Sequence, residues 1–324
     1  MKALLCTHFC APDGLELADI PEPTAGPSEV VVRVRAAALN FFDTLIIAGK
    51  YQTKPPMPFS PAAEFAGEIE SVGDGVTAVA VGDHVLGYVG YGAARERIAV
   101  AAEKLVKMPP GLDFDRAAGV CVTYGTTFYA LKDRARLASG ETLAVLGASG
   151  GVGLAACELG KLMGARVIAC ASSDEKLAFA RKHGADDGID YSKDDLKDAL
   201  RKLTGGKGAD VIYDPVGGAY TETALRSIAW EGRLLVVGFA AGDIPKLPLN
   251  LVLLKSCDVL GVFWGAWIAR DLAGHRTNTA QLLSWAAEGK LSSHVHAVYP
   301  LDEAAAALRA IAERKVMGKA ILRP

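Results

Sequence analysis

The sequence lacks the features that mark several functional classes. Its 324 residues carry a net charge of −2, so its charge balance gives no reason to expect nucleic acid or an anionic membrane as its main partner. No apolar run is long enough to span a bilayer, and Met1–Cys6 predicts a short strand, too brief for a signal peptide. The six cysteines are scattered and form no C-x-x-C pair, which fits free thiols in a reducing compartment. We therefore expect a cytoplasmic protein with no nucleic acid and no membrane among its partners.

The most informative segment that is present is residues 143–153, Leu-Ala-Val-Leu-Gly-Ala-Ser-Gly-Gly-Val-Gly. An apolar run breaks here into a glycine turn and then into small helix formers, so a buried strand is expected to end in a loop that opens a helix. Unpaired N–H groups and the positive end of the helix dipole would converge on that loop, which suits a pyrophosphate. The expected cofactor-binding residues of the loop are Ala148, Ser149, Gly150, Gly151 and Val152.

The glycine fingerprint itself is imperfect. Its usual form is G-x-G-x-x-G, and here Ala148 stands at the first glycine position, ahead of Gly150 and Gly153. A plain strand-turn-helix unit, or a domain for another nucleotide, would look similar. Apolar strands are expected to follow at Ala165–Ala171, Ala209–Asp214, Arg233–Phe239 and Cys257–Phe263, with helices at Leu154–Met163 and Ser173–His183. This alternation predicts a doubly wound parallel sheet, with the loop at the C-terminal end of its first strand.

The first part of the chain has a different character. Short strands are expected at Val30–Ala37, Glu64–Val72 and Asp83–Tyr88, and a helical segment at Asp115–Ala135. Strand character returns at His294–Tyr299 and Lys319–Leu322, around a helix at Leu301–Arg314. We predict an α/β protein with a small β-barrel domain, residues 1–120 completed by 291–324, and a parallel-sheet dinucleotide-binding domain, residues 121–290.

The order of several motifs is recognisable along the whole chain. They are Asn40–Thr44, Gly49–Tyr51, Val72-Gly73, Val81–Val85, Gly125–Tyr129, Gly150–Gly153, Asp214–Gly218 and Gly318–Ala320. In these stretches the chain resembles the medium-chain dehydrogenase/reductase superfamily, and within it the zinc-independent NADPH:quinone oxidoreductases of the zeta-crystallin type. The resemblance implies a GroES-like catalytic domain, a Rossmann domain and a cleft between them.

Zinc-dependent members of this superfamily hold a catalytic metal with Cys, His and Cys. The resemblance puts Asn40, Ala63 and Thr123 at those positions, and Cys121 misses the third by two residues. Glu64 follows Ala63 and is expected to be a structural acid. The six histidines form no ligand cluster. Because a stable zinc site needs three or four converging ligands, we expect no metal.

The expected cofactor is NADPH. A Rossmann domain that prefers NAD carries an acid at the end of its second strand, and Ser172 stands there instead, with Lys176 one helical turn later. Lys176 is equally well interpreted as a solvated helix charge, and the nearby acid Asp174 is expected to cap the helix. Tyr191 matches a family tyrosine near the adenosine phosphate. The resemblance further implies cofactor contacts from Thr127, Phe239, Phe263 and Lys319, although Phe263–Trp267 could instead be core or subunit interface.

Hydride addition to a quinone or an enone builds negative charge on the carbonyl oxygen, which a proton donor stabilises. Tyr51 is the expected donor, since it matches the proton donor of related enoyl-thioester reductases. Asn40 and Asp43 complete the candidate catalytic residues. Each has an alternative: Tyr51 could pack a loop, and Asn40 and Asp43 could hold a turn, which for Asp43 is the favoured interpretation.

The sequence thus predicts a homodimeric, zinc-independent, NADPH-dependent reductase of a small quinone or α,β-unsaturated carbonyl compound. Several related quinone reductases carry a tyrosine and a basic residue where this chain has Leu45 and Ile47, which makes the expected pocket more apolar. One alternative is an enoyl- or acrylyl-CoA reductase, which would need a basic rim for the phosphates of CoA. Another is a non-enzymatic NADPH-binding protein of the crystallin type, or an RNA-binding protein.

Overall fold

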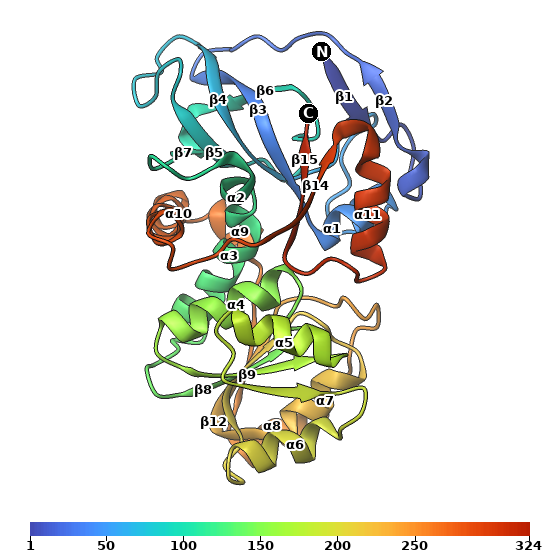
Figure 1. Ribbon diagram of the computed structural model, residues 1–324, viewed down its shortest axis with the longest axis vertical. Helices are drawn as coiled ribbons and strands as arrows, with labels where there is room; N and C mark the ends of the chain where they lie inside the picture. Colours follow the sequence, from blue (N-terminus) through green and yellow to red (C-terminus); the bar gives the residue numbers. More distant parts are fainter. The chain divides into compact units, whose positions relative to one another are not determined.

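The computed structural model describes residues 1–324 and divides them into two compact units. The first unit comprises Met1–Val122 and Asp271–Pro324, and the second is the continuous segment Thr123–Arg270. Both ends of the chain therefore belong to the first unit (Figure 1). None of the helices combines the length and the apolar character that crossing a membrane requires.

The second unit is built on a six-stranded parallel sheet in the order β10-β9-β8-β11-β12-β13. Its strands are β8 (Thr142–Leu146), β9 (Arg166–Ala171), β10 (Asp187–Asp190), β11 (Ala209–Asp214), β12 (Ile228–Val236) and β13 (Asp258–Gly261). This order is that of a doubly wound dinucleotide-binding sheet, whose switch point lies between β8 and β11. The predicted fold class is confirmed for this unit.

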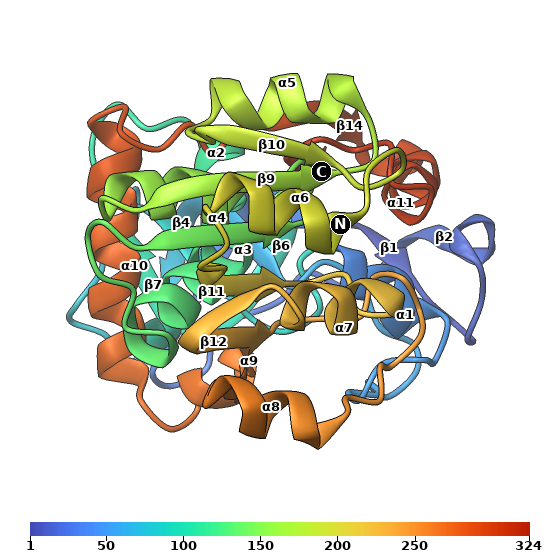
Figure 2. The same ribbon diagram turned by 90° about the horizontal axis from the view of Figure 1, so that it is seen from below.

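Helices cover both faces of the parallel sheet. The helices of the chain are α1 (Phe41–Ile47), α2 (Phe114–Ala118), α3 (Val120–Phe128), α4 (Gly151–Leu162), α5 (Asp174–Lys182), α6 (Leu196–Leu203), α7 (Ala219–Leu225), α8 (Leu249–Lys255), α9 (Trp264–Ile268), α10 (Leu272–Ala287) and α11 (Ala304–Ala312). α4 and α5 lie on one side of β8 and β9, and α6, α7 and α8 lie on the other side of the sheet (Figures 1 and 2). Because both faces are covered, the strands read as continuous apolar runs.

The first unit contains a seven-stranded, mostly antiparallel sheet in the order β14-β15-β3-β4-β5-β7, with β6 paired to β3. Its strands are β3 (Glu29–Leu39), β4 (Glu64–Val72), β5 (His84–Tyr88), β6 (Arg97–Ala101), β7 (Leu105–Lys107), β14 (Val295–Pro300) and β15 (Lys319–Arg323), and β1 (Lys2–Leu5) pairs separately with β2 (Glu16–Asp19). β15 runs antiparallel to β3, with Ala320 opposite Leu39. The C-terminal segment is thus part of the sheet that carries the N-terminal motifs, as the predicted fold requires.

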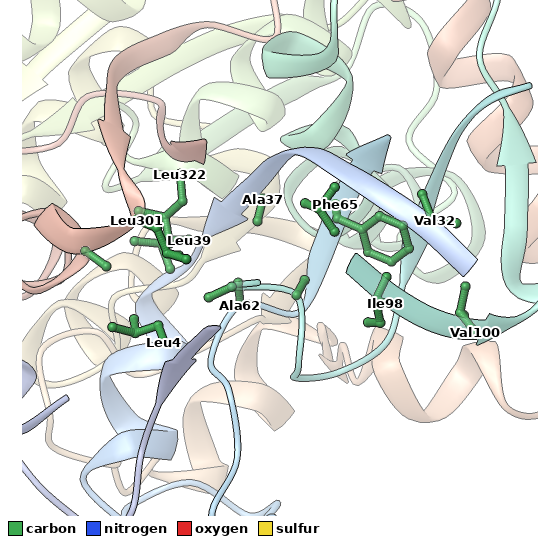
Figure 3. Packing of buried hydrophobic residues seen from close by; sticks show 14 of the residues in the cluster. Leu4, Val32, Ala37, Leu39, Ala62, Phe65, Ile98, Val100, Leu301 and Leu322 are labelled. Carbon is green, nitrogen blue, oxygen red and sulfur yellow. The ribbon is translucent and has the colours of Figure 1, made fainter. Parts of the chain in front are cut away.

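The core of this unit lies between the sheet and the helices around it. Figure 3 shows Leu39 of β3 packed beside Leu301 and Leu322 of the C-terminal segment, and Phe65 of β4 near Val32 and Ile98 in the same cluster. Burial of these side chains, each contributing about 1.5–3 kcal/mol, fixes β15 against β3. Residue 319 at the start of β15 is therefore held close to residues 39 and 40.

Several predicted boundaries differ from the structure: β12, for example, runs over Ile228–Val236 instead of the expected Arg233–Phe239. α10 was expected in the second domain, and it belongs to the first unit, where the Arg116 guanidinium of α2 donates to the Ala286, Leu291 and Ser292 carbonyls at 3.0–3.1 Å. The expected helical segment Asp115–Ala135 is divided into α2, α3 and a π-helical turn at Tyr129–Arg134, with its first break at Gly119.

Candidate functional site

The glycine loop after β8 is shaped by two glycines. Gly147 has φ of +62° and accepts a hydrogen bond from the Gly150 N–H at 3.1 Å, which turns the chain back toward α4. A Cβ at Gly153 would lie 2.1 Å from the Gly147 carbonyl oxygen, so α4 packs on the loop where no side chain fits. The first N–H groups of α4 have no partner inside the helix, and they open onto this loop.

The missing first glycine of the fingerprint has a structural explanation. Gly147 supplies the left-handed backbone, whereas Ala148 is not among the residues with positive φ. Ala148 is fully buried, and its N–H bonds to the Cys170 carbonyl of β9 at 3.2 Å. An alanine is therefore accommodated at this position, because the turn is made one residue earlier.

A second loop at the switch point follows β11. The Asp214 carboxylate accepts hydrogen bonds from the Val216 and Gly217 N–H groups at 2.8 and 2.9 Å and from the Thr221 hydroxyl at 2.6 Å. A Cβ at Gly147 would lie 2.9 Å from Val216 Cγ2, so the two loops pack against each other. Asp214 belongs to the Asp214–Gly218 motif, and its role, which the sequence alone does not indicate, is to shape this loop through its carboxylate.

Phe239, a predicted cofactor neighbour, lies against this second loop. A Cβ at Gly217 would lie 2.9 Å from a carbon of the Phe239 ring. Phe239 follows β12, whose last residue is Val236. The structure thus brings Phe239 to the same sheet edge as the glycine loop.

Thr127 joins α3 to this region. It is fully buried, and its hydroxyl lies 2.8 Å from the Tyr213 hydroxyl of β11 and 3.3 Å from the Val152 carbonyl in the first turn of α4. It also lies 2.8 Å from the Thr123 carbonyl. Burial raises the pKa of Tyr213, so this hydroxyl pair is neutral. Thr127 therefore connects the start of α4 to the end of β11.

Ser172 and Lys176 lie together at the end of β9. The Lys176 ammonium donates to the Ser172 hydroxyl at 3.3 Å. The expected cap of α5 is corrected: Ser173 caps the helix by accepting from the Lys176 N–H at 3.3 Å, and Asp174 instead pairs with Lys193 at 2.6 Å. Because Ser173 is the cap, the Asp174 carboxylate is not needed for capping, and Lys193 partly neutralises its charge.

Tyr191 lies beside the same strand end. Its N–H bonds to the Ala171 carbonyl at 3.0 Å, and its ring centroid is 4.5 Å from that of Tyr220 on α7. Ala171 is the residue before Ser172, so Tyr191, Ser172 and Lys176 border one edge of the second unit. The three residues predicted to recognise the adenosine end are therefore close in space.

The aromatic residues of Phe263–Trp267 divide into exposed and buried ones. The Trp264 ring is buried, and a Cβ at Gly125 would lie 2.7 Å from it. Trp267 stacks on Tyr129 with centroids 4.5 Å apart. Phe263, in contrast, is 60% exposed. Trp264 is therefore core, and Phe263 remains accessible.

In the first unit the candidate catalytic residues belong to a buried charge cluster. Asn40, Asp43, Glu64 and Lys319 are all buried. The Lys319 ammonium donates to Asn40 Oδ1 at 2.6 Å and to Glu64 Oε1 at 2.9 Å, and Asn40 Nδ2 donates to the same Glu64 oxygen at 2.9 Å. Glu64, expected to be a structural acid, and Lys319, expected to be a cofactor contact, both bond to Asn40 in the structure.

Asp43 holds two segments of backbone. Its carboxylate accepts from the Asn40 N–H at 2.7 Å, at the start of α1, and from the Ala62 N–H at 3.1 Å. Ala62 has φ of +64°, a strained conformation for a residue with a side chain. Burial raises the pKa of Asp43 to about 7. This geometry matches the turn-holding interpretation of Asp43.

Tyr51 lies at the rim of the same core. Its ring stacks on Phe42 with centroids 5.5 Å apart and an angle of 26°, and it packs against the buried cluster. Burial, and next the charge of Asp43, raise the pKa of Tyr51. The phenol is therefore protonated at neutral pH, the state that a proton donor requires.

The side chains that could ligate a metal are dispersed. No group of three or more His, Cys, Asp and Glu side chains is placed to hold a metal ion. Cys121, whose thiol interacts electrostatically with Glu64 and Lys319, is fully buried, and burial raises its pKa well above the usual value. Glu64 and Asp43 are the carboxylates of the cluster, and Lys319 is its cation.

Known proteins match this chain along its whole length. Residues 26–110 match the family described as the alcohol dehydrogenase GroES-like domain, and residues 151–287 match the family described as zinc-binding dehydrogenase. The protein named quinone oxidoreductase-like protein 2 of Rattus norvegicus is 38% identical over 322 residues, which cover 99% of this chain and 91% of the relative.

Solved structures agree with the sequence matches. The quinone oxidoreductase of Pseudomonas syringae pv. Tomato DC3000 has a TM-score of 0.92 at 34% identity, covering 100% of this chain and 99% of that chain. The Escherichia coli quinone oxidoreductase complexed with NADPH has a TM-score of 0.93 at 28% identity and covers 100% of both chains. The fold and the order of motifs in this chain are thus shared with proteins of one family.

Proposed function

Because this chain belongs to the quinone oxidoreductase-like branch of the medium-chain dehydrogenase/reductase superfamily, we propose that it is an NADPH-dependent, metal-free reductase. Its substrate is a quinone or an α,β-unsaturated carbonyl compound. The observation that carries the proposal is the pair of glycine loops at the switch point of the sheet, where such sheets bind dinucleotides.

The residues of the second unit fit NADPH. A Cβ at Gly150 would meet only the Gly147 carbonyl oxygen, at 3.6 Å, so the loop has space for a diphosphate beside the N-terminus of α4. Ala148 to Val152 would hold this diphosphate. Ser172 and Lys176 would accept the 2′-phosphate, with Tyr191 beside the adenosine. Thr127, Phe239 and Phe263 would border the nicotinamide end.

NADPH, when bound, supplies the hydride. The residues of the first unit then have to manage the charge that develops on the carbonyl oxygen of the substrate. Tyr51 donates the proton, which is supported by its protonated phenol at the rim of the core. Asn40 and Asp43 act as positioning residues, since the Asn40 amide already bonds to Glu64 and Lys319 and the Asp43 carboxylate to two backbone N–H groups.

The proposal is tested by following NADPH oxidation against a quinone, a simple enone and an enoyl-CoA. We expect turnover of the quinone or the enone. Turnover of the enoyl-CoA alone would replace the proposal with a CoA-ester reductase. Tight NADPH binding without turnover of any acceptor would replace it with a non-enzymatic binding protein.

We further propose a homodimer in a reducing compartment such as the cytoplasm. β13 pairs with β12 on one side only, and Leu249, Leu253, Leu254 and Val259 on α8 and β13 are exposed. An unpaired apolar strand edge is a template for pairing with a second copy. All six cysteines are free thiols, which fits a reducing environment.

A further inference from the structure

The ammonium of Lys319 is fully used inside the first unit. Lys319 is the first residue of β15, and Gly318 before it has φ of +84°. Its three N–H donors meet three acceptors: the Leu39 carbonyl at 3.0 Å, Asn40 Oδ1 at 2.6 Å and Glu64 Oε1 at 2.9 Å. Lys319 is 4% exposed, so the side chain has no donor left for a cofactor phosphate.

Glu64 depends on this cation. The side chain of Glu64 is 0% exposed, and a buried carboxylate without a partner costs several kcal/mol. One oxygen accepts from Lys319 and Asn40, and the other accepts from the Val122 N–H at 2.7 Å. The carboxylate is therefore both neutralised and hydrogen-bonded, the condition under which a buried ion pair is tolerated.

The groups of this cluster do not fit the zinc that one matching family description implies. A zinc ligand must be a thiolate, a neutral imidazole or a carboxylate. The cluster offers an amide at Asn40, and the nearby Cys121 is a buried thiol whose pKa is raised by burial and by the charge of Glu64. Glu64 is already bonded by Lys319, Asn40 and the Val122 N–H.

We infer that the Lys319 ammonium is the resident cation of this unit and takes the organising role that a metal would otherwise have. It joins the end of β3, the cap of α1, the start of β4 and the start of β15. α1 leads directly to Gly49–Tyr51, so Lys319 is a positioning residue for the proposed proton donor. The structural role of Lys319 is independent of the proposed function. The effect of Lys319 on turnover rests on the proposed function.

The experiment compares Lys319→Met, Glu64→Gln, the double variant Glu64→Gln/Lys319→Met, and Lys315→Met as a control. Lys315 is an exposed lysine of the same unit. We expect Lys319→Met to lower Tm strongly, because Glu64 is left buried without a cation, and the double variant to regain the larger part of the loss. Lys315→Met keeps the wild-type Tm.

Kinetics separate this role from a cofactor contact. We expect kcat of Lys319→Met to fall about tenfold to a hundredfold through misplacement of the α1–Tyr51 segment, with KM for NADPH within about twofold of wild type. A raised KM for NADPH at wild-type Tm would overturn the inference and make Lys319 a phosphate contact. If Lys319→Met does not fold, the inference is tested by comparing Glu64→Gln with the double variant. The inference requires the double variant to have the higher Tm, because it carries no unpaired buried charge.

Metal content gives an independent readout. Protein purified from zinc-supplemented medium is analysed for bound metal, and Tm is measured with and without a chelator. We expect substoichiometric zinc and no change in Tm. One tightly bound zinc per chain whose removal lowers Tm would overturn the inference. If the wild-type protein turns over no acceptor, the proposed function is wrong. The Tm measurements still test the structural role of Lys319.

Discussion

At the scale of single residues, the proposed preference for NADPH rests on Ser172 and Lys176, which are in contact at the end of β9. Replacing Ser172 by Asp puts a negative charge beside the expected 2′-phosphate, and like charges at close range cost several kcal/mol. We expect KM for NADPH to rise about tenfold or more, with KM for NADH little changed. Steady-state kinetics with both cofactors measure the ratio of KM for NADPH to KM for NADH. Lys176→Met removes the cation beside Ser172, and Lys182→Met, in the last turn of α5, is its matched control. Equal affinity of the wild type for both cofactors would remove this role from Ser172 and Lys176.

Tyr51 is tested by removing one oxygen. In Tyr51→Phe the ring still stacks on Phe42, and only the proton donor is lost. We expect kcat to fall about a hundredfold while KM for NADPH is unchanged. Tyr91→Phe is the control, since Tyr91 also packs against the core of the first unit, edge-on to Phe59. Unchanged turnover of Tyr51→Phe would leave Tyr51 as a packing residue.

Asp43 gives the stability of the protein a pH dependence of known sign. Burial raises its pKa to about 7, opposed by Lys319 and reinforced by Glu64, so the folded state binds the proton more tightly than the unfolded chain. The resulting stabilisation is complete below about pH 4 and is lost as the pH rises through about 7. We expect the Tm difference between wild type and Asp43→Asn to shrink over this interval in a pH series of thermal melts. A difference that does not shrink between about pH 4 and 7 would mean that Asp43 is ionised over this whole interval.

Residue roles divide into those that sequence could predict and those that depend on tertiary contacts. Ser172 and Lys176 are four residues apart on one helix start, so local spacing predicted their proximity, and the structure has them in contact. Lys319 and Asn40 are brought together only when β15 pairs with β3. No local pattern indicates where the Lys319 side chain points, and only the family resemblance implied that it contacts the cofactor.

α4 provides a test at the scale of the element. In Gly153→Ala the new methyl group would overlap the Gly147 carbonyl oxygen, at 2.1 Å, so α4 must move away from the loop. We expect a loss of about 1–3 kcal/mol in the free energy of unfolding. Denaturant titration measures it.

Gly150→Ala is the matched variant. Gly150 has φ of −76° and its Cβ would find room within the protein, so stability should be close to wild type. The methyl group would occupy the space beside the N–H groups of α4, and we expect a raised KM for NADPH. A Gly150→Ala variant with wild-type KM would argue against diphosphate binding at this loop.

Prediction of the elements succeeded where the pattern is local. β4 has its expected bounds, Glu64–Val72, because the strand ends at the turn sequence Gly73-Asp74-Gly75. The expected helical segment Asp115–Ala135 breaks at Gly119, where a Cβ would lie 3.0 Å from Lys319 Cγ. The close approach of Gly119 to Lys319 joins residues about 200 positions apart, and periodicity cannot detect such a contact.

At the scale of the whole molecule the exposed apolar edge predicts the oligomeric state. Light scattering after size exclusion should give a dimer for the wild type. Leu253 is 79% exposed on α8, and we expect Leu253→Asp to shift the protein toward monomer by placing a charge in the interface. Val81→Asp, at an exposed position of the first unit, should remain dimeric. A monomeric wild type would contradict the proposal.

The division of the chain into units has a consequence for the order of events during synthesis. The second unit is complete once Arg270 has left the ribosome, whereas the first unit waits for residues 271–324. Until β15 is made, Glu64 lacks its lysine and β3 lacks one of its neighbouring strands. A ribosome-bound chain that stops before residue 319 should therefore carry a folded nucleotide-binding unit beside a protease-sensitive first unit. β15, translated long after Glu64, is the strand that completes the charge balance of the site.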